Sequence, residues 1–395
     1  MLSLLSLALA LDTKKIPNQE IYLDDRGIKS FSTSVQFAVL GDTRPAVAGE
    51  GEATKRVTTS KTTEQIVADL SGTIRAGRTE FIVLLGNLVP SSSVAAWKQF
   101  SQAWSLVLSG SEPPEGGQLR VRTLPVVGST DGIQDDRYFG FGAAFPGVGA
   151  DIGFNRVATW YHVDLDVSGH TWRLVSVDSN KPTMGSRWDE QMAYIEAAFS
   201  ADQGEYDSVL VFVHHPLITL AAGQSSNEGG ATSELLSQID GATKVGAIKA
   251  VFSSHSHAGE VYLPRGKFGE LYVNAGGGGA PADNLARWGH AEAGGFPDVK
   301  LETTFDFALL RELEKQAAER KCSPAAIDHA KSTESWKGFP GEYEAGCFPV
   351  QGWWDVTLTG EKLSLSWRQV QPDGTLRAIY TADFGGKKTG WSIGQ

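Results

Sequence analysis

The sequence predicts an α/β sandwich, in which two mixed sheets pack together and are flanked by helices. Two observations lead to this fold class. Short apolar runs end abruptly in polar or glycine-rich tips, which is typical of strands buried on both faces. Segments with helical spacing of apolar residues lie between these runs. Such alternation of strand and helix indicates a layered α/β domain.

Six predicted strands and three predicted helices make up this alternation. The strands occupy residues 35–40, 81–85, 121–127, 172–177, 209–213 and 248–252. The helices each place large apolar residues on one face: Ile66, Val67, Leu70 and Ile74 in the first, Trp97, Phe100 and Trp104 in the second, and Trp188, Met192, Ile195 and Phe199 in the third. We expect ligands to bind beyond the carboxyl ends of the strands, where the polar tips gather.

The last part of the chain has a different pattern. Residues 352–358, 362–370 and 375–384 are predicted antiparallel strands, joined by turns at 359–360 and 372–374. Periodicity is weak before them, apart from a charged helix predicted at 305–320. We therefore divide the chain into a core at 31–281, an insertion at 282–349, and C-terminal strands at 350–395 that complete the core.

Composition excludes several classes of protein. The chain has 395 residues, 41% of them hydrophobic and 10% aromatic, which is too apolar for a disordered protein. The formal net charge of −11 argues against nucleic acid as a partner, since that needs clustered Lys and Arg. No uncharged apolar stretch of about 18 residues is present, so no transmembrane segment is predicted.

The N-terminus and the cysteines bear on localisation. Residues 1–10 are almost wholly apolar and end in Ala8-Leu9-Ala10, which resembles the end of a truncated signal segment. The alternative is a frayed apolar terminus. Cys322 and Cys347 would form one disulfide in an exported protein, and would be two unrelated buried thiols in a cytosolic one. We predict an exported protein, whether periplasmic, extracellular or at the cell surface.

The strand-end tips form an ordered series of motifs. In chain order they read GDTR (41–44), GN (86–87), GSTD (128–131), HHP (214–216), SHSH (254–257) and NAGGGGAP (274–281). This series resembles the calcineurin-like metallophosphoesterases, especially their exported, purple-acid-phosphatase-like branch, over residues 37–281. Members of that family hold two divalent metals at the strand ends and hydrolyse phosphate esters. The resemblance implies a metallophosphoesterase-type α/β/β/α sandwich.

The resemblance also assigns roles to individual residues. It places metal ligands at Asp42, Asn87, His214, His255 and His257, and catalytic side chains at Arg44 and Asp131. Asp42 and His257 fall at first-metal positions, and His214 and His255 at second-metal positions. His255 and His257 are alternate residues, so on a strand they would face the same way, which suits a shared site.

Several positions depart from the family pattern. Asn87 stands in place of the bridging aspartate, Ser129 in place of an asparagine ligand, and Thr130 in place of the histidine that protonates the leaving group. Arg44 replaces another histidine and adds a positive charge, while Asp131 would support a histidine that is missing. Two divalent ions would bring four positive charges against one remaining carboxylate. Uncompensated charge in a dry pocket is costly.

We therefore predict a metallophosphoesterase-like protein whose dinuclear site has degraded. Phosphoester hydrolysis would be weak or lost, leaving a binding or structural role, with one divalent metal (Fe, Zn or Mn) or none. The alternative is an active phosphoesterase with a mononuclear or atypical metal centre. Arg44 could bind a phosphate ester or other anion, or form an ion pair with Asp42 or Asp131. His214 and the neighbouring His215 could also be core histidines. The insertion at 282–349 could dock a protein partner.

Overall fold

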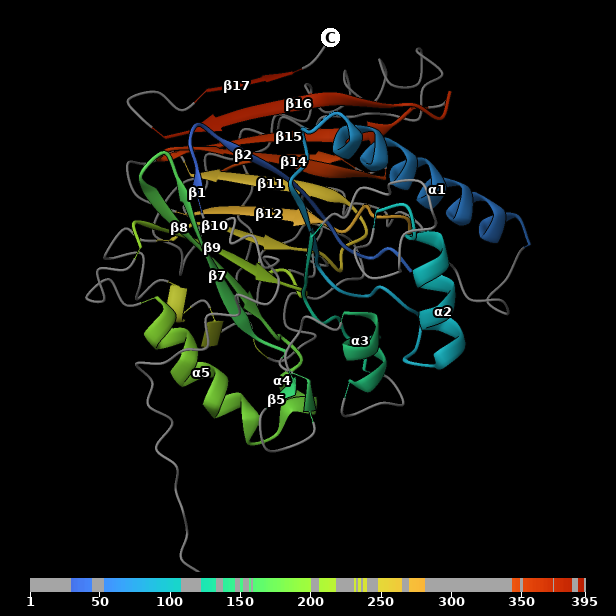
Figure 1. Ribbon diagram of the computed structural model, residues 1–395, viewed down its shortest axis with the longest axis horizontal. Coiled ribbons are helices and arrows are strands. Elements are labelled where there is room, and N and C mark those ends of the chain that lie inside the picture. The colour runs from blue at the N-terminus through green and yellow to red at the C-terminus, as the bar shows by residue number, and fades with distance from the viewer. Residues whose placement is uncertain are drawn as a thin grey trace, which may run out of the picture.

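The structure is a computed structural model (Figure 1). Its fold is a sandwich of two mixed sheets. The residues that the structure describes are 30–44, 53–107, 122–132, 138–145, 150–151, 156–157, 159–199, 206–217, 231, 234–235, 237–239, 248–264, 270–280, 343–348, 351–371, 373–385 and 390–393. The proposed signal segment, Cys322 and the helix predicted at 305–320 lie outside these residues.

The first sheet has eight strands. Its spatial order is β1 (Ser30–Phe31), β7 (Tyr161–Val167), β8 (His170–Val177), β9 (Ser208–Val213), β10 (Ile248–Ser253), β12 (Leu271–Ala275), β11 (Gly259–Pro264) and β13 (Tyr343–Phe348). β8, β9, β10 and β12 are parallel neighbours. β13, which comes from the end of the predicted insertion, pairs antiparallel with β11.

The second sheet has seven strands. Its order is β17 (Gly390–Ile393), β16 (Leu376–Phe384), β15 (Lys362–Val370), β14 (Gly352–Thr359), β2 (Val35–Leu40), β3 (Phe81–Leu84) and β4 (Arg122–Pro125). β2, β3 and β4 are parallel, whereas β14 joins β2 antiparallel with Trp354 opposite Val39. The C-terminal strands therefore extend the sheet that the N-terminal strands begin. A separate ribbon pairs β5 (Ala150–Asp151) with β6 (Arg156–Val157).

Three apolar layers hold the sandwich together. The inner faces of both sheets share one core, to which Phe37 of β2, Val163 of β7 and Trp354 of β14 contribute. A second core lies between the eight-stranded sheet and α5 (Arg187–Ala198), and a third lies between the seven-stranded sheet and α1 (Ala53–Arg75) and α2 (Val94–Ala103). The order is therefore helix, sheet, sheet, helix, as predicted. Two further short helices are α3 (Phe139–Ala144), whose Phe141 packs against Trp97 of α2, and α4 (Lys181–Met184), which follows β8.

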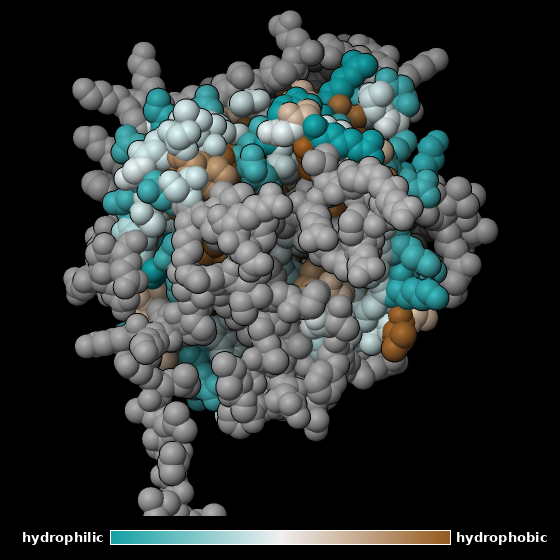
Figure 2. Space-filling model, in the orientation of Figure 1, coloured by the Kyte–Doolittle hydropathy of each residue, from teal (hydrophilic) through white to brown (hydrophobic). Residues whose placement is uncertain are grey.

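The outer faces of β15 and β16 are partly exposed. β15 alternates between buried and more exposed residues along its length. In the upper part of Figure 2, where β15, β16 and α1 lie, hydrophilic residues are mixed with residues of intermediate hydropathy and a few apolar ones. Among the described residues, no helix combines the length and the apolar character that crossing a membrane requires.

The carboxyl ends of the parallel strands of both sheets meet at one edge of the sandwich. The main-chain N–H of Gly41, after β2, donates to the carbonyl of Ala275, at the end of β12. This contact joins one sheet to the other. The polar tips of both sheets are thereby brought into one cluster, at the place where open α/β sheets bind ligands.

Candidate metal and anion site

The candidate residues are buried at this junction. Asp42, Asn87, Asp131 and His214 expose 0%, 1%, 0% and 0% of their surface, and His255 and His257 expose 8% each. Asp42 follows β2, Asn87 follows β3 and His214 follows β9. These side chains therefore lie at strand ends, where the sequence analysis expects ligands to bind.

Glycines allow the strand-end loops to pack backbone against backbone. A Cβ on Gly128 would lie 2.0 Å from the main-chain nitrogen of Asn87. Gly86 has a φ of +83°, and a Cβ there would lie 2.4 Å from the nitrogen of Gly128. Only glycine fits such a close approach. The GN and GSTD loops are therefore held in direct contact.

The orientation of the Asn87 amide is fixed by its neighbours. The main-chain N–H of Thr130 donates to Asn87 Oδ1 at 2.9 Å, and Ser129 Oγ donates to the same oxygen at 3.1 Å. A main-chain N–H cannot accept a hydrogen bond, so the amide oxygen must face it. The other side of the amide, Nδ2, then donates to Asp42 Oδ1 at 3.0 Å. Asn87 therefore presents a donor to Asp42, where a bridging ligand would present an oxygen to a metal.

The Asp42 carboxylate accepts further hydrogen bonds from the protein. The main-chain N–H of His255 donates to Asp42 Oδ2, and His257 Nε2 lies 3.5 Å from Oδ1. Burial alone would raise the pKa of Asp42, but the hydrogen bond and charge of His257 are the main effects that outweigh burial and hold this pKa well below its usual range. The carboxylate is thus stabilised by protein donors on both oxygens.

Arg44 lies at the same place. Its Nη2 is 3.4 Å from His257 Nε2, and its main-chain N–H donates to the carbonyl of Asn87. The guanidinium thus adds positive charge next to the Asp42–His257 pair. A pair of metal ions does not fit at Asp42 and Asn87. The amide hydrogen of Asn87 points at the Asp42 carboxylate, and the Arg44 guanidinium adds a positive charge beside His257, so both disfavour cations there.

The tautomer of His214 is set by a carbonyl. Its Nδ1 lies 2.8 Å from the carbonyl oxygen of Leu85, which can only accept, so Nδ1 carries the hydrogen. Ser254 Oγ also donates to this oxygen, at 2.6 Å. Nε2 of His214 therefore has a lone pair, and this buried atom has no hydrogen-bond partner within the described structure. A ring that donates one N–H to a carbonyl and offers the other nitrogen is arranged as metal-bound histidines are.

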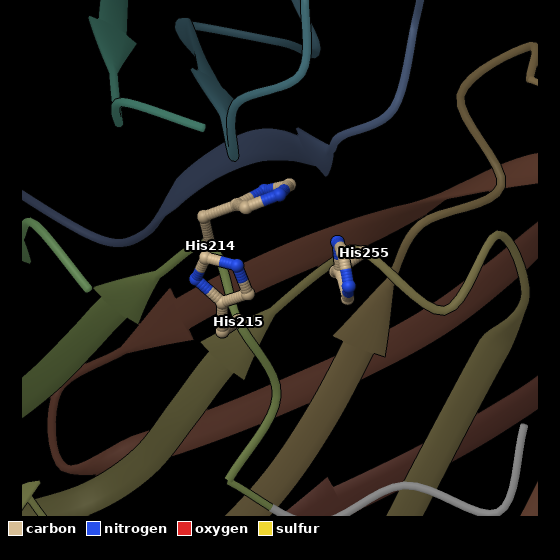
Figure 3. A group of neighbouring side chains, drawn as sticks. All are labelled: His214, His215 and His255. Atoms are coloured by element: carbon tan, nitrogen blue, oxygen red, sulfur yellow. The ribbon is translucent and has the colours of Figure 1, made fainter. Parts of the chain in front are cut away.

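Two further imidazoles surround His214. The ring centroids of His214, His215 and His255 lie 4.7–5.1 Å apart, and the candidate ligand atoms lie within 4.8 Å of one another. Figure 3 shows the three rings converging from the ends of β9 and β10. Burial lowers the pKa of His214 to about 3 and that of His215 well below its usual value, so both rings are neutral near pH 7. This cluster could hold one metal ion.

His215 was not among the predicted ligands. Its Nδ1 lies 2.7 Å from Ser179 Oγ, which follows β8. Adjacent residues of a strand face opposite sides of the sheet. The doublet, however, follows the last strand residue, Val213, where that rule no longer applies. The HHP motif was the available signal.

The expectation that His255 and His257 share a strand face was wrong. β10 ends at Ser253, and both histidines lie in the following loop with positive φ angles, 70° and 49°. The left-handed backbone turns the two side chains to different neighbours. His255 joins the histidine cluster, whereas His257 contacts Asp42 and Arg44.

Asp131 binds the backbone of two loops. Its Oδ1 accepts from the N–H groups of Leu88 and Val89 at 2.8 and 3.2 Å, and its Oδ2 accepts from Gly128 N–H at 2.9 Å. Complete burial raises its pKa to about 6, although these hydrogen bonds oppose the shift. These contacts let Asp131 fix the loop that carries Asn87.

No protein-family model matches the chain, and no curated protein matches it by sequence. Solved structures do match. GAP50, the anchor in the inner membrane complex of Plasmodium, aligns with a TM-score of 0.53 at 14% identity over 90% of each chain. The purple acid phosphatase PPD1 from yellow lupin (Lupinus luteus) seeds aligns with a TM-score of 0.52 at 17% identity, over 88% of this chain and 53% of its own.

The chain has the metallophosphoesterase fold. This sandwich, with sites at the carboxyl ends of the strands of both sheets, is what the motif series predicted. The likeness concerns the fold, so the chemistry of this member depends on the side chains described above.

Proposed function

We propose that this metallophosphoesterase-fold protein has lost two-metal phosphoester hydrolysis and serves a binding or structural role. The hydrogen bond from Asn87 Nδ2 to Asp42 Oδ1 carries this proposal. Two-metal hydrolysis needs an anionic ligand between the ions, which neutralises them and sets their separation. A neutral amide that points its hydrogens at the remaining carboxylate supplies neither property.

Two further features support the loss of hydrolysis. Thr130 stands where a proton donor would be needed, and its hydroxyl contacts Asn87 Oδ1 and the carbonyl of Val89. A threonine hydroxyl is a poor general acid, because its pKa lies far above neutral pH. Asp131 has both oxygens engaged by backbone N–H groups, which supports a positioning role in place of the predicted catalytic one.

A structural role has a parallel within the fold. The neighbour GAP50 is described as an anchor in a membrane complex, so this sandwich can serve in attachment. For the present chain, we propose export and a protein partner that docks on residues 282–349, on the strength of the apolar N-terminus and the long insertion. Removal of 282–342, which spares strand β13 of the eight-stranded sheet, should then abolish partner binding without unfolding the core, as measured by pull-down and circular dichroism. Unchanged partner binding would contradict the docking proposal.

The test of lost hydrolysis is turnover by purified protein. We expect no hydrolysis of p-nitrophenyl phosphate or bis-p-nitrophenyl phosphate above the buffer rate, with Fe, Zn or Mn added. The matched control is the triple variant Asn87→Asp, Ser129→Asn, Thr130→His, which restores the family residues and should gain turnover. Hydrolysis by the wild type with two bound metal ions would overturn the proposal.

A second candidate is a phosphoesterase with one metal ion, favoured by the unpartnered Nε2 of His214. Asp42, the histidines and Arg44 would form its site, with Arg44 binding the phosphate of the substrate. This candidate predicts that the wild type hydrolyses one of the two esters and that His257→Ala abolishes the activity. Activity that survives this substitution would exclude it.

A further inference from the structure

We propose that Glu260 is a positioning residue of the candidate site, which holds the loop of residues 254–258 in the conformation that presents His255 and His257. Neither the motif series nor the family resemblance gives Glu260 a role. The proposal rests on the proposed function, because a binding role is favoured by a site that is formed before its ligand arrives. It adds a residue behind the loop to those that line the site.

Glu260 is buried inside the eight-stranded sheet. It lies in β11 between β12 and β13, opposite Asn274 and Cys347, and exposes 0% of its surface. A carboxyl group is rarely buried to this degree unless polar partners hold it. The neighbouring residues Val261 and Val273 belong to the core between the sheets, so alternation along the strands turns Glu260 and Asn274 together to the other face.

One oxygen of Glu260 joins two segments that border the site. Oε2 accepts from Asn274 Nδ2 at 2.9 Å and from Ser256 Oγ at 3.2 Å. Ser256 lies between His255 and His257, and Asn274 begins the glycine-rich segment 274–281. The carboxyl group therefore ties the glycine-rich segment to the middle of the histidine loop.

The backbone of the histidine loop depends on such restraints. His255 and His257 have φ angles of 70° and 49°, in the left-handed region that residues other than glycine rarely adopt. Backbone of this kind persists only where surrounding contacts fix it. The main-chain N–H of Ser256 donates to the carbonyl of Ser254 at 2.8 Å, which closes a tight turn, and its hydroxyl donates to Glu260. Glu260 thus restrains the residue that separates the two left-handed histidines.

Asn274 extends the restraint to the opposite side of the loop. Its Oδ1 accepts from the main-chain N–H of Gly276 at 3.3 Å. A Cβ on Gly276 would lie 2.6 Å from the main-chain nitrogen of His257 and 3.2 Å from Asp42 Oδ2. The histidine loop therefore packs directly against the glycine-rich segment, and Glu260 holds both.

The position of His255 is what this restraint controls at the site. The main-chain N–H of His255 donates to Asp42 Oδ2. A displacement of Ser256 would turn the adjacent peptide units and take this donor away from Asp42. The strand before the loop has its own support, because β10 pairs with β9 on one side and β12 on the other. Loss of Glu260 should therefore loosen the loop while β10 stays formed.

The experiment measures amide hydrogen exchange by mass spectrometry in the full chain without metal. It compares a peptide that covers residues 254–258 with one that covers β10. Glu260→Ala removes the acceptor, whereas Glu260→Gln retains an oxygen that can accept from both donors. Ser256→Ala removes one donor and decides the question if Glu260→Ala fails to fold. Glu270→Ala is the matched control, since Glu270 is a second buried glutamate, 6% exposed, that accepts from the Tyr272 hydroxyl.

We expect exchange of residues 254–258 to be about 10-fold faster or more in Glu260→Ala, and at least about threefold faster in Ser256→Ala, because each variant removes buried hydrogen bonds of the loop. Exchange of β10 should stay within about threefold of the wild type in every variant, as should exchange of residues 254–258 in Glu260→Gln and Glu270→Ala.

Three results would overturn the proposal: unchanged exchange of residues 254–258 in Glu260→Ala and Ser256→Ala, equal acceleration of both peptides, or a Glu260→Gln variant that exchanges as fast as Glu260→Ala. Hydrolysis of the phosphate esters by the wild type with two bound metal ions would instead overturn the proposed function.

Discussion

The substitution Asn87→Asp tests how the Asp42 carboxylate is stabilised. It would replace a donor with a second carboxylate oxygen, in a contact where Asn87 Nδ2 and Asp42 Oδ1 are 3.0 Å apart. Two unit charges at 3.0 Å repel by about 5.5 kcal/mol at an effective dielectric constant of 20. The folded protein can avoid this repulsion by protonating the introduced carboxyl, whose O–H would then donate to Asp42 as the amide does.

Protonation limits the magnitude and gives it a pH dependence. Holding a proton at pH 7 on a group with an unfolded-state pKa of about 3.9 costs about 4 kcal/mol, since each pKa unit is worth about 1.4 kcal/mol. The folded-state pKa of the introduced group is raised, so the folded state binds more protons and stability falls as pH rises above about 4. The expected loss in the free energy of unfolding is therefore about 4 kcal/mol at pH 7 and about 1.5 kcal/mol at pH 5.

Urea unfolding with EDTA at pH 5, 6 and 7 measures this loss relative to the wild type. Asn87→Ala is the control: it leaves the N–H of Thr130 without its acceptor and should cost about 1–3 kcal/mol at every pH. Added Mn²⁺ or Zn²⁺ should recover more stability in Asn87→Asp than in Asn87→Ala, because only the first variant supplies a second carboxylate to the metal. A loss in Asn87→Asp that is no larger at pH 7 than at pH 5 would refute the reasoning.

Three other predictions concern the neighbourhood and its supports. Because the pKa of Asp131 is raised to about 6, its ionisation costs the folded state about 2.5 kcal/mol between pH 4 and pH 7. The stability of Asp131→Asn relative to wild type should rise by that amount over this range, and a flat difference in urea unfolding would count against it. Gly128→Ala should disrupt the contact between the GN and GSTD loops and lower the free energy of unfolding by more than about 3 kcal/mol. Gly72→Ala in α1, where a Cβ meets nothing within 4 Å, should raise it by about 0.5–1 kcal/mol. Thermal unfolding measures both variants, and equal effects would contradict the prediction. Asp69→Ala should lower the free energy of unfolding by about 1–3 kcal/mol, because Asp69 joins α1 to β15 through two hydrogen bonds from Arg368. An unchanged midpoint in urea unfolding would exclude this role.

The strands and helices followed from local pattern. Continuous apolar runs such as Val35–Leu40 and 209–213 identify buried strands, because burial on both faces removes the alternation of polar residues. The predicted helical faces appear in α1, α2 and α5, with Ile66, Trp97 and Trp188 buried as expected. β7, β11 and β12 were not predicted.

Which strands pair was decided by contacts that no local pattern contains. β13 comes from a region whose periodicity is weak, yet it pairs with β11 over six residues. Pairing of this kind depends on which edge remains open once the rest of the sheet has formed.

The sequence by itself determined that Asp42, Asn87, His214, His255 and His257 belong to strand ends, since parallel strands bring their carboxyl ends to one edge. Only the tertiary structure decided what each side chain does there. The amide of Asn87 is turned by Thr130, 43 residues away, and the tautomer of His214 is set by the carbonyl of Leu85, 129 residues away. His215 enters the cluster, and His257 leaves it, through loop conformations. Hydrogen-bond direction and loop dihedrals depend on partners brought together by folding, and residue spacing alone does not encode them.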